Sequence, residues 1–183
     1  MDGIIKDAGR ISQAIVYFDK QGFQQVFDEV ELPALTAMFE EDESLGNIGK
    51  SQYWAGIDAM EMSLTAKSIH PDILKVVFNQ IESTNITIRA NVMEYESGRL
   101  VDQVPYSVSA RVRFSESSAG ALTGKESAEY EFTAQVMTLK VEYNGEQVLN
   151  VDLAGNIYEV GGVDLLQKMR ANLGMGDAVG GVR

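Results

Sequence analysis

Apolar and polar residues alternate with a period of two through the middle of the chain, as is typical of strands that turn one face to a core. The clearest run has an apolar face formed by Val104, Tyr106, Val108, Ala110, Val112 and Phe114. Its polar face is formed by Ser107, Ser109, Arg111 and Arg113. Such patterns predict strands at 13–19, 23–36, 56–66, 84–95, 99–115, 126–143, 146–153 and 156–160. We therefore expect a mainly β protein, an antiparallel β-barrel or a sandwich of two packed sheets.

The alternation slips by one residue inside the run at 126–143. The first apolar set is Tyr130, Phe132, Ala134 and Val136, and the second is Leu139, Val141 and Tyr143. A straight strand would turn the second set toward water, so the slip predicts a β-bulge near Met137-Thr138. A strand that bends there can take part in two sheets.

Two hairpins are predicted between these strands. Asn144-Gly145 is the strongest turn signal, because a two-residue type I′ turn needs positive φ at both positions. The segment 115–125 is rich in Ser, Ala and Gly and predicts a second hairpin. If that loop centres near Ala121, a cross-strand charge ladder would pair Arg113 with Glu129 and Arg111 with Glu131.

Two segments have helical periodicity instead. Proline in the first turn and an acid at the positive end of the helix dipole predict a flanking helix near 71–81. Its apolar stripe is Ile73, Leu74, Val77, Phe78 and Ile81. A short C-terminal helix is predicted near 164–173, where Asp164 can accept hydrogen bonds from the first amides. The side chains expected to dock this helix on the rest of the fold are Leu165, Leu166, Met169 and Leu173.

Length and composition predict one domain. The 183 residues are 45% hydrophobic, which is enough for one substantial core. We expect a domain over residues 1–174 and a flexible tail over 175–183. The chain has no apolar run of about 18 residues, and its acidic start lacks the apolar core of a signal peptide. Synthesis in a cytoplasm and no membrane insertion by this chain alone are therefore expected.

The net charge argues against specific nucleic-acid binding. Twenty-seven acidic and fifteen basic residues give a formal net charge of −12, the wrong sign for holding phosphates. Zero cysteines exclude disulfides and thiolate chemistry. We expect no catalytic, cofactor-binding or metal-binding residues and no enzymatic activity.

Three segments resemble reactive sites and lack the required residues. Gly46–Ser51 ends like a phosphate-binding loop, but the earlier glycine is replaced by Ser44 and no helix pattern follows. The acidic run Glu40–Glu43 lacks the alternating ligands and internal glycine of a calcium loop. His70, the only histidine, immediately precedes Pro71 and is interpreted as a helix entry.

Strand length suggests self-assembly. Several alternating runs exceed the usual length of about five to six residues. Long free edges promote aggregation, so a protein that keeps them can use them to join copies of itself. A head-to-tail contact of that kind closes a ring if the rotation permits. The alternative is a non-enzymatic β-sandwich binding module, such as a capsid decoration or adhesin domain.

With these features assembled, the chain resembles the major tail tube proteins of contractile-tailed phages over roughly residues 12–174. The order and spacing of the motifs carry the resemblance. They are Val30-Glu31-Leu32-Pro33-Ala34-Leu35-Thr36, Asp58-Ala59-Met60-Glu61-Met62-Ser63-Leu64, Pro71-Asp72, Leu139-Lys140-Val141, Asn144-Gly145, Asn156-Ile157-Tyr158-Glu159-Val160, Gly162-Val163-Asp164-Leu165 and Arg170-Ala171-Asn172-Leu173-Gly174. One departure is Gly161, where the family often has asparagine. The tubes of phage-tail-like bacteriocins and of type VI secretion are related.

The resemblance implies a structural subunit of stacked hexameric rings, whose sheets merge into a β-barrel around a lumen. The implied partners are further copies of the chain, a tail sheath protein, a baseplate initiator and a tail terminator. DNA would pass through the lumen during ejection without specific binding, and acidic residues would repel it in a way that weakens with salt. The implied location is the virion tail, assembled in the bacterial host cytoplasm.

In such tubes the loop after this Leu-Pro-x-Leu-Thr strand reaches a neighbouring ring, which here corresponds to about residues 37–55. Apolar side chains in an acidic loop would be exposed to water in a monomer, and they could be buried against another subunit in an assembly. The expected inter-ring residues are Met38, Phe39, Glu40, Glu41, Ile48, Tyr53 and Trp54.

Overall fold

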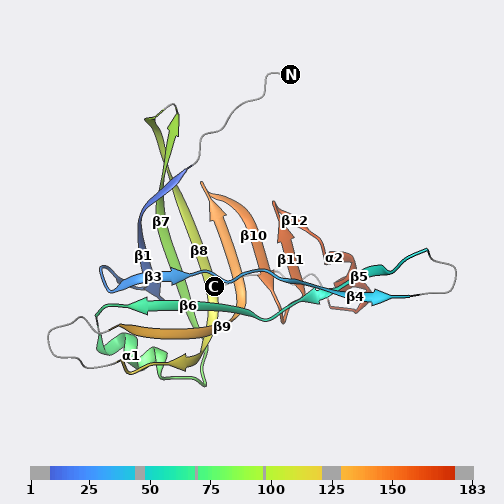
Figure 1. Cartoon of the computed structure of the whole chain (residues 1–183), viewed down its shortest axis with the longest axis horizontal. Helices are drawn as coiled ribbons and strands as arrows, with labels where there is room; N and C mark the ends of the chain where they lie inside the picture. The colour runs from blue at the N-terminus through green and yellow to red at the C-terminus, as the bar shows by residue number, and fades with distance from the viewer. Residues whose placement is uncertain (1–8, 44–47, 69, 97, 121–128, 176–183) are drawn as a thin grey trace.

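The computed structural model describes residues 9–43, 48–68, 70–96, 98–120 and 129–175. Antiparallel strands dominate this part, as the alternation predicts, and they form one ten-stranded sheet and one separate two-stranded sheet (Figure 1). The strands are β1 (Arg10–Phe18), β2 (Gln21–Phe23), β3 (Phe27–Glu31), β4 (Ala37–Asp42), β5 (Ser51–Ile57), β6 (Met60–Ala66), β7 (Thr84–Glu96), β8 (Arg99–Ser117), β9 (Tyr130–Tyr143), β10 (Glu146–Asp152), β11 (Ile157–Val160) and β12 (Val163–Asp164). The helices are α1 (Pro71–Val77) and α2 (Gln167–Asn172).

The large sheet is open. Its main path runs β12-β11-β10-β9-β8-β7-β1-β2, and β6 and β3 add to it at β9. Within the described residues the path does not return to its first strand, so the sheet is not closed into a barrel. The mainly β, antiparallel class with two short helices is confirmed.

The bulge predicted in the longest slipping run is confirmed. Arg111 pairs with Thr138 while the next residue of β8, Val112, pairs with Val136, which leaves Met137 as the extra residue of β9. Before the bulge β9 pairs with β6, and after it with β10. One bent strand therefore takes part in two layers, because the bulge keeps both apolar sets on the inner side.

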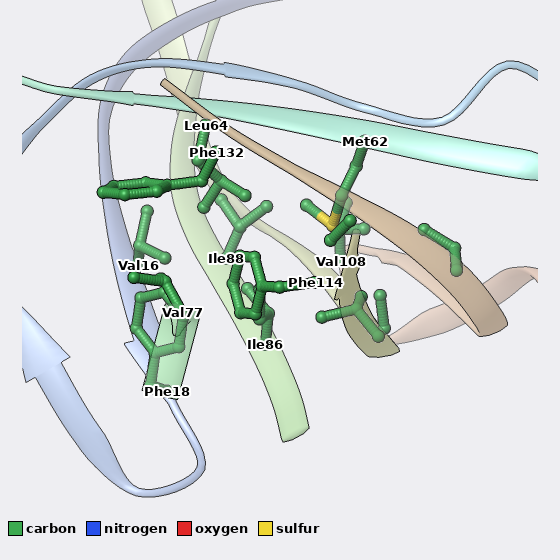
Figure 2. Packing of buried hydrophobic residues seen from close by; sticks show 14 of the residues in the cluster. Val16, Phe18, Met62, Leu64, Val77, Ile86, Ile88, Val108, Phe114 and Phe132 are labelled. Atoms are coloured by element: carbon green, nitrogen blue, oxygen red, sulfur yellow. The ribbon is translucent and has the colours of Figure 1, made fainter. Parts of the chain in front are cut away.

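The core lies between the β3–β6–β9 layer and the face of β1, β7 and β8. Figure 2 shows Leu64 and Phe132 of the first layer approaching Val16 and Ile88 of the second. The Phe114 ring lies 6.2 Å from the Phe18 ring and 6.5 Å from the Phe132 ring, measured between centroids. These aromatic contacts join strands from both layers. Helix α1 closes one end of the core through Ile73 and Val77.

The strand expected at 23–36 and the helix expected at 71–81 have different bounds in the structure. The strand expected at 23–36 is divided into β2 and β3, because Gln25 has a φ of 62° that breaks the extended run. The helix expected at 71–81 ends at Val77, and Asn79 then accepts hydrogen bonds from the amides of Ile81 and Glu82. Phe78 and Ile81 are consequently exposed, at 48% and 87% of their surface, instead of joining the apolar stripe.

The predicted charge ladder between β8 and β9 is wrong. Arg113 lies opposite Gln135 and Arg111 opposite Thr138, and Arg111 Nε donates to Ser83 Oγ at 3.0 Å. The register follows the need to keep the apolar sets of both strands inward, and the bulges shift the polar residues accordingly. The Asn144-Gly145 turn is confirmed, with φ values of 51° and 80°.

Candidate assembly surfaces

Strands β4 and β5 form a projecting two-stranded ribbon within the segment where the sequence predicts a loop. Strands β4 and β5 pair only with each other among the described strands and extend away from the large sheet (Figure 1). Phe39 lies opposite Trp54, and the register shifts between Met38 and Phe39 next to Gly56, whose φ is 144°. The register of β4 and β5 therefore decides which side chains share a face of the two-stranded sheet.

Apolar side chains occupy both faces of this hairpin. Directly opposed residues share a face, so Phe39 and Trp54 lie on one side, and Tyr53, opposite Glu40, lies on the other. The exposed fractions of Phe39, Tyr53 and Trp54 are 56%, 59% and 43%, and Met38 and Ile48 are exposed as well. An isolated two-stranded sheet is marginal in water, and no other part of the chain that the structure describes covers these apolar surfaces.

The acids of the hairpin are solvated and form surface contacts. Glu41 accepts a hydrogen bond from Lys50 Nζ at 3.0 Å and another from Gln52. Both charged partners are more than half exposed, so the pair stabilises the hairpin only weakly. Residues Ile48–Ser51 lead into strand β5, whereas a phosphate-binding loop would lead into a helix. The described residues contain no group of three side chains able to hold a metal ion.

His70 has the predicted role at the start of α1. Its Nδ1 accepts a hydrogen bond from the Asp72 amide at 3.4 Å, and its ring lies edge-on to Phe23 with centroids 5.4 Å apart. Hydrogen bonds from Lys75 and then Gln21 lower the pKa of Asp72 below its ordinary value. The histidine is therefore a helix cap packed on an aromatic ring.

The C-terminal unit is built on a glycine turn. Gly161 and Gly162 have φ values of 57° and 80°, a left-handed pair that lets Val160 turn back and pair with Val163. Asp164 then accepts the amide of Leu166 at 3.0 Å, just before α2 begins. The helix is shorter than the predicted span 164–173, because its first residues continue the sheet as β12.

A buried ion pair holds α2 in place. Arg170 is 5% exposed and donates through Nη1 to Asp164 Oδ1 at 3.1 Å and to the carbonyl of Asn156 at 2.9 Å. A second, short contact joins Nη2 to Asp164 Oδ2. The Arg170 hydrogen bonds lower the pKa of Asp164 below its ordinary value. The sequence pattern does not predict this pair, because Asp164 lies on a two-residue strand too short to show any periodicity.

The apolar stripe of α2 faces outward in the single chain. Leu165 and Leu173 are 56% and 62% exposed, Met169 is at the surface, and Leu166 alone is half-buried. The expected docking of these residues on the core therefore differs from the structure, since Arg170 occupies the inward side of the short helix. Val160 and Val163 are exposed beside the stripe.

The layer formed by β3, β6, the first half of β9 and the end of β8 has two free edges. Strand β3 pairs only with β6, and β8 beyond Val112 pairs only with β9, so no described strand covers the outer edge at either side. Unpaired edges of this kind are templates for pairing with another chain.

The outer face of the same layer is strongly acidic. Register places one set of side chains on this face, opposite the core, and its charged members are Glu29, Glu31, Glu61, Glu116, Glu131 and Arg113. Its neutral members include Ser63, which donates to Glu31 at 3.2 Å. The face therefore carries five acids against one base, a single-sign field.

A different open face is electrically balanced. A hollow of about 480 Å³ lies on the polar side of β7, β8, β9 and β10. Its charged lining residues are Asp19, Lys20, Arg111, Lys140, Glu142 and Asp152, three of each sign. Lys140 Nζ lies 2.7 Å from Glu142 Oε1, so part of this charge is paired internally. The excess negative charge of the chain thus lies elsewhere, on the acidic face of the β3–β6–β9 layer among other places.

No helix in the described part of the chain is long and apolar enough to cross a membrane. Of the tail expected at 175–183, only Met175 lies within the described residues.

Comparisons with known proteins give one matching family and solved structures of a similar fold. The model of one family, described as "Phage tail tube protein FII", matches residues 8–174. No curated protein matches the chain. A chain of an extracellular contractile injection system, the PVC sheath-tube complex in its extended state, is 13% identical, with a TM-score of 0.52, and the match covers 71% of this chain and 88% of that one.

Two further solved structures have a similar fold. A chain of the anti-feeding prophage cap, described as the AFP tube terminating cap, is 15% identical with a TM-score of 0.55, and the match covers 78% of this chain and 95% of that one. A chain of the anti-feeding prophage baseplate is 10% identical with a TM-score of 0.50, and the match covers 70% and 90%. At these identities the likenesses show the fold alone.

Proposed function

Because the chain belongs to the phage tail tube protein FII family, we propose that it is the repeating structural subunit of a contractile tail tube. In this proposal hexameric rings stack around a lumen through which DNA is ejected. The similar fold of a chain from a sheath-tube complex supports a sheath around the tube. The folds of the tube-terminating cap and baseplate chains support a terminator at one end and a baseplate initiator at the other.

The observation that carries the proposal is the four-stranded layer with free edges at β3 and at the end of β8. Two such edges on opposite sides of one layer let each subunit pair with a neighbour on either side. Edge-to-edge pairing repeated around a closed rotation gives a continuous β-barrel without free edges. The free edges, which would favour aggregation in a monomer, are then all satisfied.

The acidic outer face of this layer suits the wall of the lumen. If the layer closes into a barrel with its apolar face toward the rest of each subunit, Glu61, Glu131 and their acidic neighbours line the passage. Their charges repel the phosphates of passing DNA, so the polyanion slides without binding. The balanced hollow on β7–β10 would not supply such repulsion.

The hairpin β4–β5 and the stripe on α2 are the proposed contact surfaces beyond the barrel. Phe39, Tyr53 and Trp54 expose apolar surface on both faces of the hairpin, as expected of a segment that inserts between other subunits. Leu165 and Leu173, which lie just before and just after α2, expose further apolar surface. We assign the hairpin, with the residues expected from the sequence, to contacts between rings.

The protein would then lie in the tail of a virion or phage-like particle that assembles in the bacterial host cytoplasm. Residues 1–174 would form the tube domain, and residues 175–183 a C-terminal extension. The protein has a structural role and no catalytic one, in keeping with its family.

Immunogold electron microscopy of assembled particles tests the proposal. We expect label along the exposed tube of contracted tails, where the sheath has withdrawn. Label confined to capsids or fibres would overturn the proposal and favour the decoration or adhesin alternative.

A further inference from the structure

The two free edges of the β3–β6–β9 layer run in opposite directions. Strand β3 is antiparallel to β6, β6 to β9, and β9 to β8, so the strand direction alternates across the layer. Rotation about a barrel axis keeps the direction of each strand relative to that axis. In a ring, the end of β8 of one subunit therefore meets β3 of its neighbour in an antiparallel pair, and side chains on one face of such a pair interact across the junction.

One base and three acids meet at this junction on the acidic face. The β8 edge carries Arg113 and Glu116, and the β3 edge carries Glu29 and Glu31. All four side chains are exposed in the single chain. Among the described residues of the two edges, Arg113 is thus the one positive charge on this face.

Arg113 is free to serve a neighbouring subunit. It lies opposite the neutral Gln135 of β9, and it forms no ion pair with any other residue that the structure describes. Lys67, at the end of β6, differs because it is already paired with Asp28. The arginine therefore has an unused charge at the edge of an acidic face.

Glu31 is the acid of β3 that lies nearest to the level of Arg113. The pairings across the layer place Glu31 in one row with Ser63 and Thr133, and Arg113 in the next row with Gln135. Closure into a barrel staggers neighbouring strands. Depending on the stagger, Arg113 lies opposite Glu31 of the neighbour or diagonal to it, and a long side chain reaches across both arrangements.

The backbone of the β8 edge is covered by an exchangeable contact. Gln80 Nε2 donates to the carbonyl of Ser115 at 3.3 Å, and both residues are exposed. A backbone amide of the neighbouring β3 can replace the amide of Gln80, because one hydrogen bond is then exchanged for another. Pairing at this edge needs no change in the core.

We propose that Arg113 of one subunit forms an ion pair with Glu31 of the next subunit in the same ring, and that this pair lets the acidic edges join. The inference rests on the proposed function and names the contact that closes the ring. Without Arg113, only acids would meet at each junction, and like charges on opposed strands weaken their pairing. One arginine per subunit thus offsets the repulsion that the acidic face creates between neighbours.

An exchange of the two charges tests the pair. Arg113→Glu leaves only acids at the junction, so the yield of tubes in expressing bacterial cells should fall at least about tenfold, as counted by electron microscopy. Arg113→Glu with Glu31→Arg restores one base and three acids. This double variant should recover a yield within about twofold of the unmodified protein.

Two measurements separate assembly from folding. Because Arg113 is exposed, the Arg113→Glu monomer should unfold at nearly the same urea concentration as the unmodified monomer. Arg99→Glu is the matched control, since Arg99 is also exposed but lies at the β7–β8 turn, and it should form tubes normally. If Arg113→Glu does not fold, Arg113→Gln carries the test, and its tube yield should fall several-fold.

The outcomes distinguish this inference from the proposed function. Normal tubes from the Arg113 variants, or no recovery in the double variant, would overturn the ion pair and leave the tube assignment standing. Absence of the unmodified protein from tails would overturn the tube assignment itself.

Discussion

Arg170 of α2 and Asp164 of β12 form a buried ion pair, and this pair attaches the last helix to the sheet. Their side chains are 6% and 15% exposed, and Arg170 also donates to the carbonyl of Asn156. The exposed leucines that flank α2, Leu165 and Leu173, contribute little to that attachment. The arrangement leaves the apolar side of the helix available for contacts with other subunits.

Replacing Arg170 with Met should release α2. Removal of one partner from a buried pair leaves an uncompensated charge and costs on the order of 3 kcal/mol. We expect faster amide hydrogen exchange in α2 and β12, while β7 and β8 keep their protection, because opening is local. Lys168→Met on the exposed side of the helix is the control and should change exchange little. Equal effects of the two substitutions would contradict the role of the pair.

Acid should loosen the same unit. The pKa of Asp164 is lowered from 3.8 in the native state by its hydrogen bonds with Arg170, while the unfolded chain keeps the ordinary value. The pair therefore stabilises α2 fully above that ordinary value, and the stabilisation is lost as the pH falls through the lower native pKa. Exchange in α2, corrected for intrinsic rates, should rise steeply on acidification in the native protein. A similar rise in Arg170→Met would argue against this cause.

Removing the aromatic pair of the hairpin should impair stacking. The double substitution Phe39→Ala and Trp54→Ala deletes two exposed side chains that face each other across β4 and β5. The monomer should unfold at nearly the same urea concentration, because neither ring contributes to the core. Electron microscopy should show few or no tubes. Ile11→Ala with Val101→Ala, two exposed apolar residues outside the hairpin, is the control and should form normal tubes. Normal tubes from the aromatic variant would reject the hairpin assignment.

Substitutions of the C-terminal leucines should affect either the stability of the monomer or the assembly of tubes, depending on which leucine is changed. Leu165→Ser with Leu173→Ser removes side chains that are mostly exposed, so the free energy of unfolding should change by less than about 0.5 kcal/mol. Leu166→Ser removes a half-buried side chain and should cost about 1–2 kcal/mol. Denaturant titration of monomers checks both values. The yield of tubes should fall in the double variant Leu165→Ser with Leu173→Ser. If this variant lost as much stability as Leu166→Ser, the two leucines would be packed against the rest of the subunit and the interpretation would be wrong.

Reversing charges on the acidic face of the β3–β6–β9 layer should make the tube bind DNA. Glu61→Lys with Glu131→Lys places cations on the face assigned to the lumen. If each subunit gains two phosphate contacts, the affinity for DNA should fall about twelvefold between about 50 and 200 mM salt. Co-sedimentation of duplex DNA with tubes measures this. The control is Glu96→Lys with Glu146→Lys, which changes two acids near hairpin turns outside that face. If both variants retained equal amounts of DNA, the acidic face would not be the wall of the lumen.

Local signals in the sequence predicted much of the fold. The slip in alternation located the bulge at Met137, because a strand can keep two out-of-phase apolar sets inward only by adding a residue. Asn144-Gly145 predicted its turn because few other dipeptides accept positive φ twice. His70 was interpreted correctly as a helix entry. Each of these features depends on residues close together in the chain.

Pairings across long distances were decided by the tertiary structure. The opposition of Arg113 to Gln135 depends on the register that keeps the core residues inward, which loop composition does not reveal. The partnership of Arg170 with Asp164 depends on a two-residue strand too short for any periodicity. The sequence alone determined the mainly β class, the bulge and the family resemblance. Only the three-dimensional arrangement decided which edges stay free and which face is acidic, because those properties arise where distant strands meet.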